Sequence, residues 1–122
     1  VWQGTIYDYA TFVREKGYLK HTNEKLFRAV TPGFDNTARR ANRAMVTDGT
    51  TPALYKTWLT DVALETMENA SLEDKLIFIN AWNEWAEGAY LEPDLKWQYG
   101  YLEATARALK EARIRMKLKV LK

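Results

Sequence analysis

The stretch from Lys75 to Asp94 constrains this chain more than any other part of the sequence. It opens with an apolar run at residues 76–79 and passes directly into a segment rich in carboxylates and aromatic rings. A short run without polar residues is typical of a strand buried on both faces of a parallel sheet. No Lys or Arg lies between Lys75 and Lys96, whereas an ordinary surface loop mixes its charges. We therefore predict a buried strand that ends in a binding or catalytic site.

The rest of the chain alternates between strand-like and helix-like patterns. The predicted strands are residues 6–7, 25–30 and 76–79, and the predicted helices begin near Asp8, at Thr51-Pro52 and near Gly100. Strands that alternate with helices predict a parallel sheet and an α/β fold. Polar residues gather just after the predicted strand ends, which is where β/α barrels and open α/β sheets build their sites.

Apolar residues at helical spacing predict which side two of the helices bury. On the helix after Pro52 these residues are Leu54, Trp58, Val62 and Met67. On the C-terminal helix they are Leu102, Ala106, Leu109 and Met116, with Ala112 or the aliphatic stem of Arg113. We expect Trp58 in the core rather than in a site.

Residues 34–51 show no helical or strand pattern and predict a long, polar, irregular loop. Loops longer than about 12–15 residues are uncommon in compact domains and are often functional. The hydrogen-bonding side chains that suit a polar ligand are Asp35, Asn36, Arg39, Arg40, Asn42 and Arg43. The alternative interpretation is a solvated crossover loop with a basic face.

Composition excludes several classes of function. The 122 residues suffice for one domain with a core, and the net charge of +2 is too small to indicate nucleic acid as a partner. The chain has no cysteine and His21 is its single histidine, so disulfides and Cys/His metal centres are excluded. No apolar run approaches the roughly 20 residues of a membrane helix, and no glycine-rich phosphate loop is present. We expect one partial domain at residues 1–122, located in the cytoplasm and without a cofactor. Because the chain starts at Val1 without Met, we expect it to be cut from a longer protein.

Glu84 and Glu87 are the candidate catalytic pair. Glycoside chemistry needs two carboxyl groups near one bond, one to protonate the leaving oxygen and one to act as base or nucleophile. Charge repulsion and an aromatic wall would keep one of the two protonated near neutrality. The side chains expected to bind a sugar are Trp82, Asn83, Trp85 and Tyr90. The structural alternative places both tryptophans in the core and pairs the glutamates with Arg39, Arg40 or Arg43.

Two weaker possibilities also depend on charge. Carboxylates could hold Ca²⁺ or Mg²⁺, but their spacing is not that of an EF-hand, so we expect no metal. The carboxylates concerned are Glu84, Glu87, Glu92 and Asp94. Residues 107–122 hold seven cations and one acid, Glu111. Such a basic helix end usually complements the helix dipole in solvent, although it could make weak contact with a membrane surface.

Three separated segments resemble one family of bacterial proteins. FINAWNEWAEGAYLEPD at residues 78–94, LFRAVTPGFDNTARR at 26–40 and YGYLEA at 99–104 are similar to WbsX-type proteins of surface-polysaccharide clusters. The domain of these proteins is similar to glycoside hydrolase family 99. The resemblance implies the C-terminal portion of a (β/α)8 TIM-barrel-like domain, because a whole barrel needs about 250 residues. Part of a barrel leaves open strand edges, so we expect a missing N-terminal portion or a homo-oligomer.

The resemblance also implies roles for single residues. Family-99 hydrolases are retaining enzymes that act on α-mannosides through two glutamates in an E-W-H-E-G segment. By position, Glu84 would act as base toward the sugar 2-hydroxyl to give a 1,2-anhydro intermediate, and Glu87 as general acid and then base. A further glutamate of the family falls on Glu92, a candidate for substrate contact. This chain has Ala86 where the hydrolases have His.

The expected function is that of a carbohydrate-active protein in the biosynthesis or processing of bacterial surface polysaccharide, such as lipopolysaccharide or O-antigen. Its partner would be an oligosaccharide or polysaccharide. WbsX-type proteins are usually labelled glycosyltransferases, but this chain shows no nucleotide-sugar motif. Two alternatives stay open. One is a non-catalytic glycan-binding module. The other is a scaffold piece of a polysaccharide assembly complex whose basic tail, residues 113–122, docks on a membrane enzyme or anionic lipid.

Overall fold

The computed structural model describes residues 1–20, 25–69 and 71–121 of the chain, so His21 lies outside the described residues. The strands are β1 (Thr5–Asp8), β2 (Arg28–Val30), β3 (Met45–Asp48), β4 (Ile77–Ile79), β5 (Asn83–Glu84) and β6 (Ala89–Tyr90). The α-helices are α1 (Tyr9–Glu15), α2 (Thr37–Arg40), α3 (Pro52–Asn69) and α4 (Gly100–Val120). The described residues also form four 3-10 turns: η1 (Gly17–Leu19), η2 (Ala41–Arg43), η3 (Leu72–Asp74) and η4 (Trp85–Glu87).

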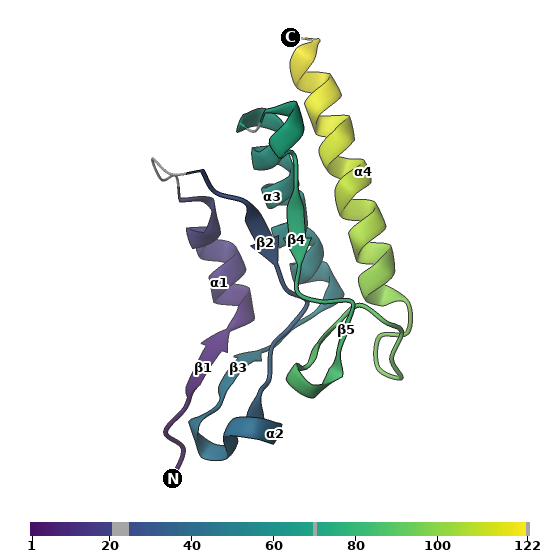
Figure 1. Cartoon of the computed structure of the whole chain (residues 1–122). Helices are drawn as coiled ribbons and strands as arrows, with labels where there is room; N and C mark the ends of the chain where they lie inside the picture. The colour runs from purple at the N-terminus through teal and green to yellow at the C-terminus, as the bar shows by residue number, and fades with distance from the viewer. Residues whose placement is uncertain (21–24, 70, 122) are drawn as a thin grey trace.

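The described strands form two parallel pairs and one antiparallel pair. β1 runs parallel to β3, with Thr5 opposite Met45, and β2 runs parallel to β4, with Arg28 opposite Ile77. Parallel neighbours need a long crossover, and the chain between β2 and β4 contains β3 and α3 (Figure 1). The predicted α/β class is therefore confirmed. Closure into a (β/α)8 barrel stays a prediction.

Local capping chemistry sets two helix starts where the sequence predicts them. The Asp8 carboxylate accepts a hydrogen bond from the Thr11 amide at 2.5 Å and caps α1. The Thr51 hydroxyl accepts one from the Leu54 amide at 3.2 Å, and α3 begins at Pro52. Such caps satisfy amides that have no partner within the helix.

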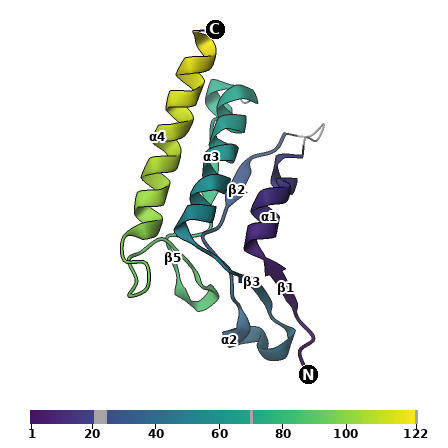
Figure 2. The ribbon, with the colours of Figure 1, turned by 180° about the vertical axis from the view of Figure 1, so that it is seen from behind.

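α3 is the central helix of the molecule. It packs along α4 and also against α1, β2 and β4, as opposite views show (Figure 1, Figure 2). Its buried residues include Trp58 and Val62. Tyr9 and Phe12 of α1 meet Trp58 edge-on, with ring centroids 5.9 and 4.8 Å away. The prediction that Trp58 lies in the core is confirmed, whereas Leu54 is only partly buried at its edge.

The face that α4 buries matches the predicted one only in part: Ala112 is buried and Leu102 packs against the core, but the other buried residues differ. The buried side chains are Tyr101, Ala104, Ala108 and Ala112. Ala106 and Leu109 of the predicted face are exposed instead. Alanine side chains are short, so a face made of them lets α4 approach α3 closely. The longer apolar residues therefore lie beside this contact rather than within it.

β4 is buried on one face only, so the prediction of a strand buried on both faces is wrong. Ile77 and Ile79 pack on the core around α3. Phe78, between them, is 58% exposed because the described residues place no second layer over its face. The ring of Phe27 lies 6.3 Å from that of Phe78, at 83° to it. Together the two rings form an exposed aromatic pair beside the parallel strands.

Residues 34–51 are not an irregular loop, since they contain α2, η2 and β3. β3 is held by contacts that are distant in sequence. The Thr47 amide donates to the Phe34 carbonyl at 2.8 Å, and the Phe34 amide donates to the Thr47 hydroxyl at 2.7 Å. Pairing with β1 supplies the rest. A strand stabilised in this way carries little signal in its own sequence.

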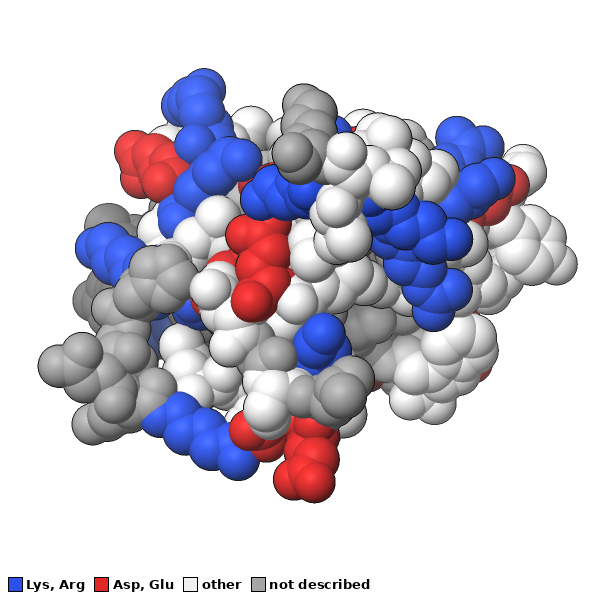
Figure 3. Space-filling view, turned by 90° about the horizontal axis from the view of Figure 1, so that it is seen from above, with Lys and Arg blue, Asp and Glu red and all other residues white. Residues whose placement is uncertain are grey.

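The basic end of α4 is partly neutralised by ion pairs. Arg115 pairs with Glu111 on the same helix, and Lys119 pairs with Glu68 of α3. Looking onto this end of the molecule, Figure 3 shows basic side chains interspersed with acidic and uncharged ones. Of the helices in the described part of the chain, none has the length and apolar character needed to cross a bilayer. Contact of residues 107–122 with a membrane surface stays a prediction.

Candidate functional site

The site segment leaves β4 as a small hairpin. β5 and β6 pair antiparallel, with Asn83 opposite Tyr90, and η4 forms the turn between them. Gly88 closes that turn with φ of +60°, a backbone conformation that glycine adopts without strain. The hairpin places Glu84 at the end of β5 and Glu87 at the end of η4, with Trp85 between them in the chain.

Trp85 is held in place by two contacts, one at its face and one at its edge. Its ring stacks on that of Tyr90 with centroids 3.7 Å apart and 15° between the planes. Its indole N–H donates to the Glu92 carboxylate at 2.6 Å. Trp85 nevertheless remains 48% exposed, and Trp82 is 53% exposed. The alternative that places both tryptophans in the core is therefore wrong, and both rings are available to a ligand.

Asp94 fixes the other half of the aromatic stack. One of its carboxylate oxygens accepts a hydrogen bond from the Tyr90 hydroxyl at 2.9 Å, and the other accepts one from the Trp97 amide. Burial, followed by this contact with Asp94, raises the pKa of Tyr90 to about 12. The phenol therefore stays protonated and donating at neutral pH. The segment after β6 is thus tied to the hairpin.

Glu87 contacts the segment that follows β2. Its carboxylate forms an ion pair with Arg39 of α2, and its backbone carbonyl accepts a hydrogen bond from the Asp35 amide at 2.7 Å. The Glu87 side chain is 18% exposed and that of Arg39 is 64% exposed. The structure thus brings Glu87 and Arg39 together, as the ion-pair alternative expects. Glu84 lies exposed at the end of β5.

The side chains of Asp35 and Asn36 already accept hydrogen bonds from backbone amides. The Asp35 carboxylate accepts from the Thr37 amide at 2.9 Å, and the Asn36 side-chain oxygen accepts from the Met45 amide at 2.8 Å. Both contacts shape the path from the end of β2 into α2 and β3. A role in substrate binding for these two residues stays a prediction, as it does for exposed Asn83.

The carboxylates considered for a metal do not form a cluster. Within the described ranges, no group of three or more acidic or imidazole side chains lies close enough to hold an ion. Glu92 and Asp94 instead accept hydrogen bonds from Trp85 and Tyr90. Their structural role is therefore to orient the two rings.

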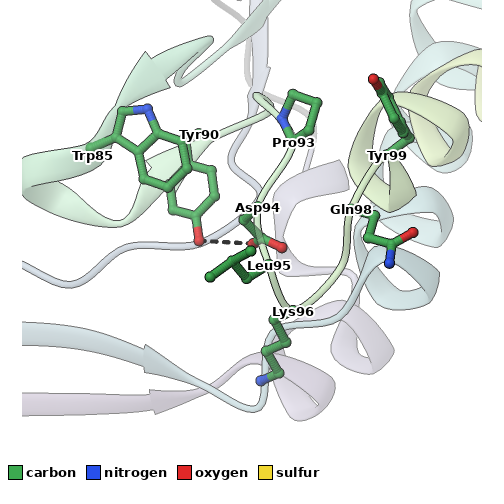
Figure 4. A pocket seen from close by; sticks show the side chains of 8 residues that line it. All are labelled: Trp85, Tyr90, Pro93, Asp94, Leu95, Lys96, Gln98 and Tyr99. Carbon is green, nitrogen blue, oxygen red and sulfur yellow. Dashed lines mark hydrogen bonds between the residues drawn. The ribbon is translucent and has the colours of Figure 1, made fainter.

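The residues predicted from the sequence form only one side of the site. An open hollow of about 670 Å³ lies between the Trp85–Tyr90 stack and the segment that leads into α4 (Figure 4). The lining residues outside the predicted set are Pro93, Asp94, Leu95, Lys96, Gln98 and Tyr99. The available signal was an exposed aromatic residue, Tyr99, beside two polar ones close after the acidic segment.

Comparison with known proteins identifies the family. The family model described as "Glycosyltransferase WbsX" matches residues 1–105. Proteins named WxcX from two strains of Xanthomonas campestris pv. campestris are each 36% identical over 111 residues, which cover 91% of this chain. No solved structure matches the chain. The chain belongs to the WbsX glycosyltransferase family, as its three motifs predict.

The matched relatives are much longer than this chain. The aligned region covers only 16% of each WxcX protein. The activity and substrates of the whole protein are therefore matters of proposal.

Proposed function

We propose that this chain contributes the glycan site of a carbohydrate-active protein in bacterial surface-polysaccharide biosynthesis or processing. In this proposal it forms the C-terminal portion of a β/α-barrel domain in the cytoplasm, and Glu84 and Glu87 act together on a glycosidic bond. Membership of the WbsX family supports the general role. The lipopolysaccharide and O-antigen setting comes from the same family resemblance.

One observation carries the proposal. Trp85 lies between the two glutamates in the chain, half exposed, with its face on Tyr90 and its N–H on Glu92. Preorganised groups bind and orient a ligand at lower cost than mobile ones. In this proposal, a sugar ring bound on this indole reaches both carboxylates. In the proposed mechanism Glu84 activates the nucleophilic oxygen, and Glu87 gives a proton to the leaving oxygen.

A second candidate function is a glycan-binding module without catalysis. The Glu87–Arg39 ion pair favours it, because it occupies the carboxylate that the mechanism needs as a proton donor. Ala86 favours it too, since no imidazole stands between the glutamates. Binding requires only the aromatic wall and hydrogen-bonding groups.

Assays on the full-length protein separate the two candidates. Wild type and the double variant Glu84→Gln/Glu87→Gln are incubated with α-mannosides, and cleavage and transfer products are measured by chromatography. The enzyme proposal expects product only from the wild type, with sugar binding retained in the variant. Glu73→Gln is the matched control, because Glu73 is an exposed acid of η3, outside the site. Binding by both proteins with product from neither would support the module.

A further inference from the structure

The hollow beside the Trp85–Tyr90 stack suits a small ligand in size and in lining. Its volume of about 670 Å³ falls within the range of roughly 300–1,000 Å³ that is typical of ligand sites. The aromatic stack lies on one side of it, and Tyr99 and Gln98 lie on the other (Figure 4). Tyr99 is 63% exposed. The hollow therefore presents aromatic surface from two separate segments of the chain.

Both sides of the hollow are held to one another by Asp94. Its carboxylate takes hydrogen bonds from Tyr90 on one side and from the Trp97 amide on the other. Its backbone carbonyl accepts a hydrogen bond from the backbone N–H of Gln98 at 2.9 Å. A ligand can therefore bind between walls that are already positioned, which lowers the entropic cost of binding.

Gln98 is held in a conformation that its side chain does not favour. Its φ is +50°, in the left-handed region that non-glycine residues rarely adopt. Strained residues of this kind cluster at ligand sites, where the surrounding structure fixes them. The side-chain amide of Gln98 offers hydrogen-bond donors and an acceptor to the hydroxyl groups of a ligand. This polar group lies on the side of the hollow opposite the Trp85–Tyr90 stack (Figure 4).

Charge around the hollow limits the kind of sugar. Asp94 lines it, and Glu92 holds the indole edge of Trp85. Lys96 is the single cation of the lining and lies 5.0 Å from the ring centroid of Trp97. Among the lining residues, one carboxylate offsets one ammonium group, so the hollow offers an anionic ligand no net attraction, while the ammonium can still donate hydrogen bonds to hydroxyls.

We infer that this hollow binds an uncharged pyranose ring of the glycan, as a subsite beside the hairpin that carries Glu84 and Glu87. The inference rests on the proposed function, since it gives the same site its ligand class. The apolar face of the ring would lie on aromatic surface of Trp85 and Tyr99, and its hydroxyls would meet Gln98 and Lys96. This assigns binding roles to Gln98 and Lys96, which lie outside the three motifs, and to Tyr99, the first residue of the third motif.

Saturation-transfer NMR on the full-length protein tests the subsite, with methyl α-mannopyranoside and methyl α-glucuronide as probes. We expect the mannoside to bind, and the glucuronide to bind roughly tenfold more weakly or not at all. Tyr99→Ala and Gln98→Gly should each weaken mannoside binding roughly five- to tenfold. Tyr99 makes no side-chain cap of α4, so its variant should fold. Tyr7→Ala is the matched control, because Tyr7 is an exposed tyrosine of β1, outside the hollow.

Three results would overturn the subsite: no mannoside binding by wild type, unchanged binding in Tyr99→Ala, or tighter binding of the glucuronide. Failure of the proposed catalysis looks different. The Glu84→Gln/Glu87→Gln variant leaves the hollow intact, so it tests bond cleavage or transfer while mannoside binding persists. Mannoside binding that depends on Tyr99, in a protein without turnover, would uphold the subsite and reject the enzyme.

Discussion

The ring of Trp85 lies flat on the ring of Tyr90, with centroids 3.7 Å apart and 15° between their planes. Each ring is fixed at its polar end by a carboxylate, Trp85 by Glu92 and Tyr90 by Asp94. A stack with both ends fixed cannot rotate away when a ligand arrives. The orientation of the stack is therefore fixed, on the hairpin that also carries the two candidate catalytic glutamates.

Removing the indole should weaken glycan binding. Trp85→Ala is expected to raise the Kd for a bound mannoside roughly tenfold, because an aromatic contact of about 0.5–1.5 kcal/mol is lost. Isothermal titration calorimetry on the full-length protein measures this. Trp2→Ala is the control, since Trp2 is also an exposed tryptophan, at 42%, but lies outside the site. Equal losses in the two variants would contradict a specific wall at Trp85.

The partly buried ion pair between β2 and α3, Arg28–Glu65, should contribute to stability. The Arg28 guanidinium donates to Glu65 at 2.7 and 3.1 Å and to the Tyr18 carbonyl at 2.7 Å. Arg28→Met removes the hydrogen bonds that the guanidinium donates to a partly buried carboxylate, so we expect the free energy of unfolding to fall by about 2 kcal/mol. Denaturant unfolding of the full-length protein reports this change.

The control for that ion pair is Lys25→Met. Lys25 pairs with Asp74 at 2.7 Å, but its side chain is 64% exposed. Exposed pairs contribute about 0–1 kcal/mol, so this variant should unfold nearly as the wild type does. A loss as large as that of Arg28→Met would show that burial does not decide the effect.

The alanine face of α4 should not accept larger side chains. Ala108 is fully buried against α3, and Ala108→Leu should cost about 1–3 kcal/mol through overpacking. Ala106→Leu, on the exposed side of the same helix, should change stability by less than about 0.5 kcal/mol. Thermal unfolding of both variants distinguishes the two faces. A larger loss of stability in Ala106→Leu than in Ala108→Leu would contradict this and favour the face that the sequence pattern predicts.

Acid should weaken the contact between α3 and α4. The hydrogen bond from Lys56, followed by the charges of Arg115 and Lys56, holds the pKa of Glu111 below its ordinary value of 4.5. A lowered pKa in the folded state adds stability above the ordinary value, and this contribution is lost as pH falls through the folded pKa. Glu111→Gln should therefore be less stable than the wild type at neutral pH and equal to it in acid. A pH-independent difference between their unfolding midpoints would contradict this.

Local chemistry was predictable from the sequence, and distant contacts were not. Asp8 and Thr51 begin helices because each caps amides three residues onward, within one short stretch of sequence. β3 escaped prediction because its pairing partner, β1, lies about forty residues earlier in the chain. The buried face of α4 was missed because alanines give a weak apolar signal next to Leu109.

The candidate site was likewise predictable from the sequence only in part. Its position after β4 follows from the order of apolar and acidic segments in residues 76–94. The Glu87–Arg39 ion pair was one of several pairings that the sequence allowed, and only the fold selects it. The bond from Tyr90 to Asp94, and with it the hollow, depends on how the segment after β6 turns back. Spacing alone does not determine that turn.

In the proposed mechanism, Glu87 protonates a leaving oxygen while Glu84 activates the attacking one. The most direct measurement compares kcat of Glu87→Gln and of wild-type full-length protein on two α-mannosides, one with a sugar and one with a 4-nitrophenol leaving group. We predict a loss of at least about 100-fold on the first substrate and a much smaller loss on the second, because nitrophenolate leaves without a proton. Glu73→Gln, the exposed control, should lose nothing on either substrate. Wild-type turnover of the sugar-leaving substrate by Glu87→Gln would contradict the account.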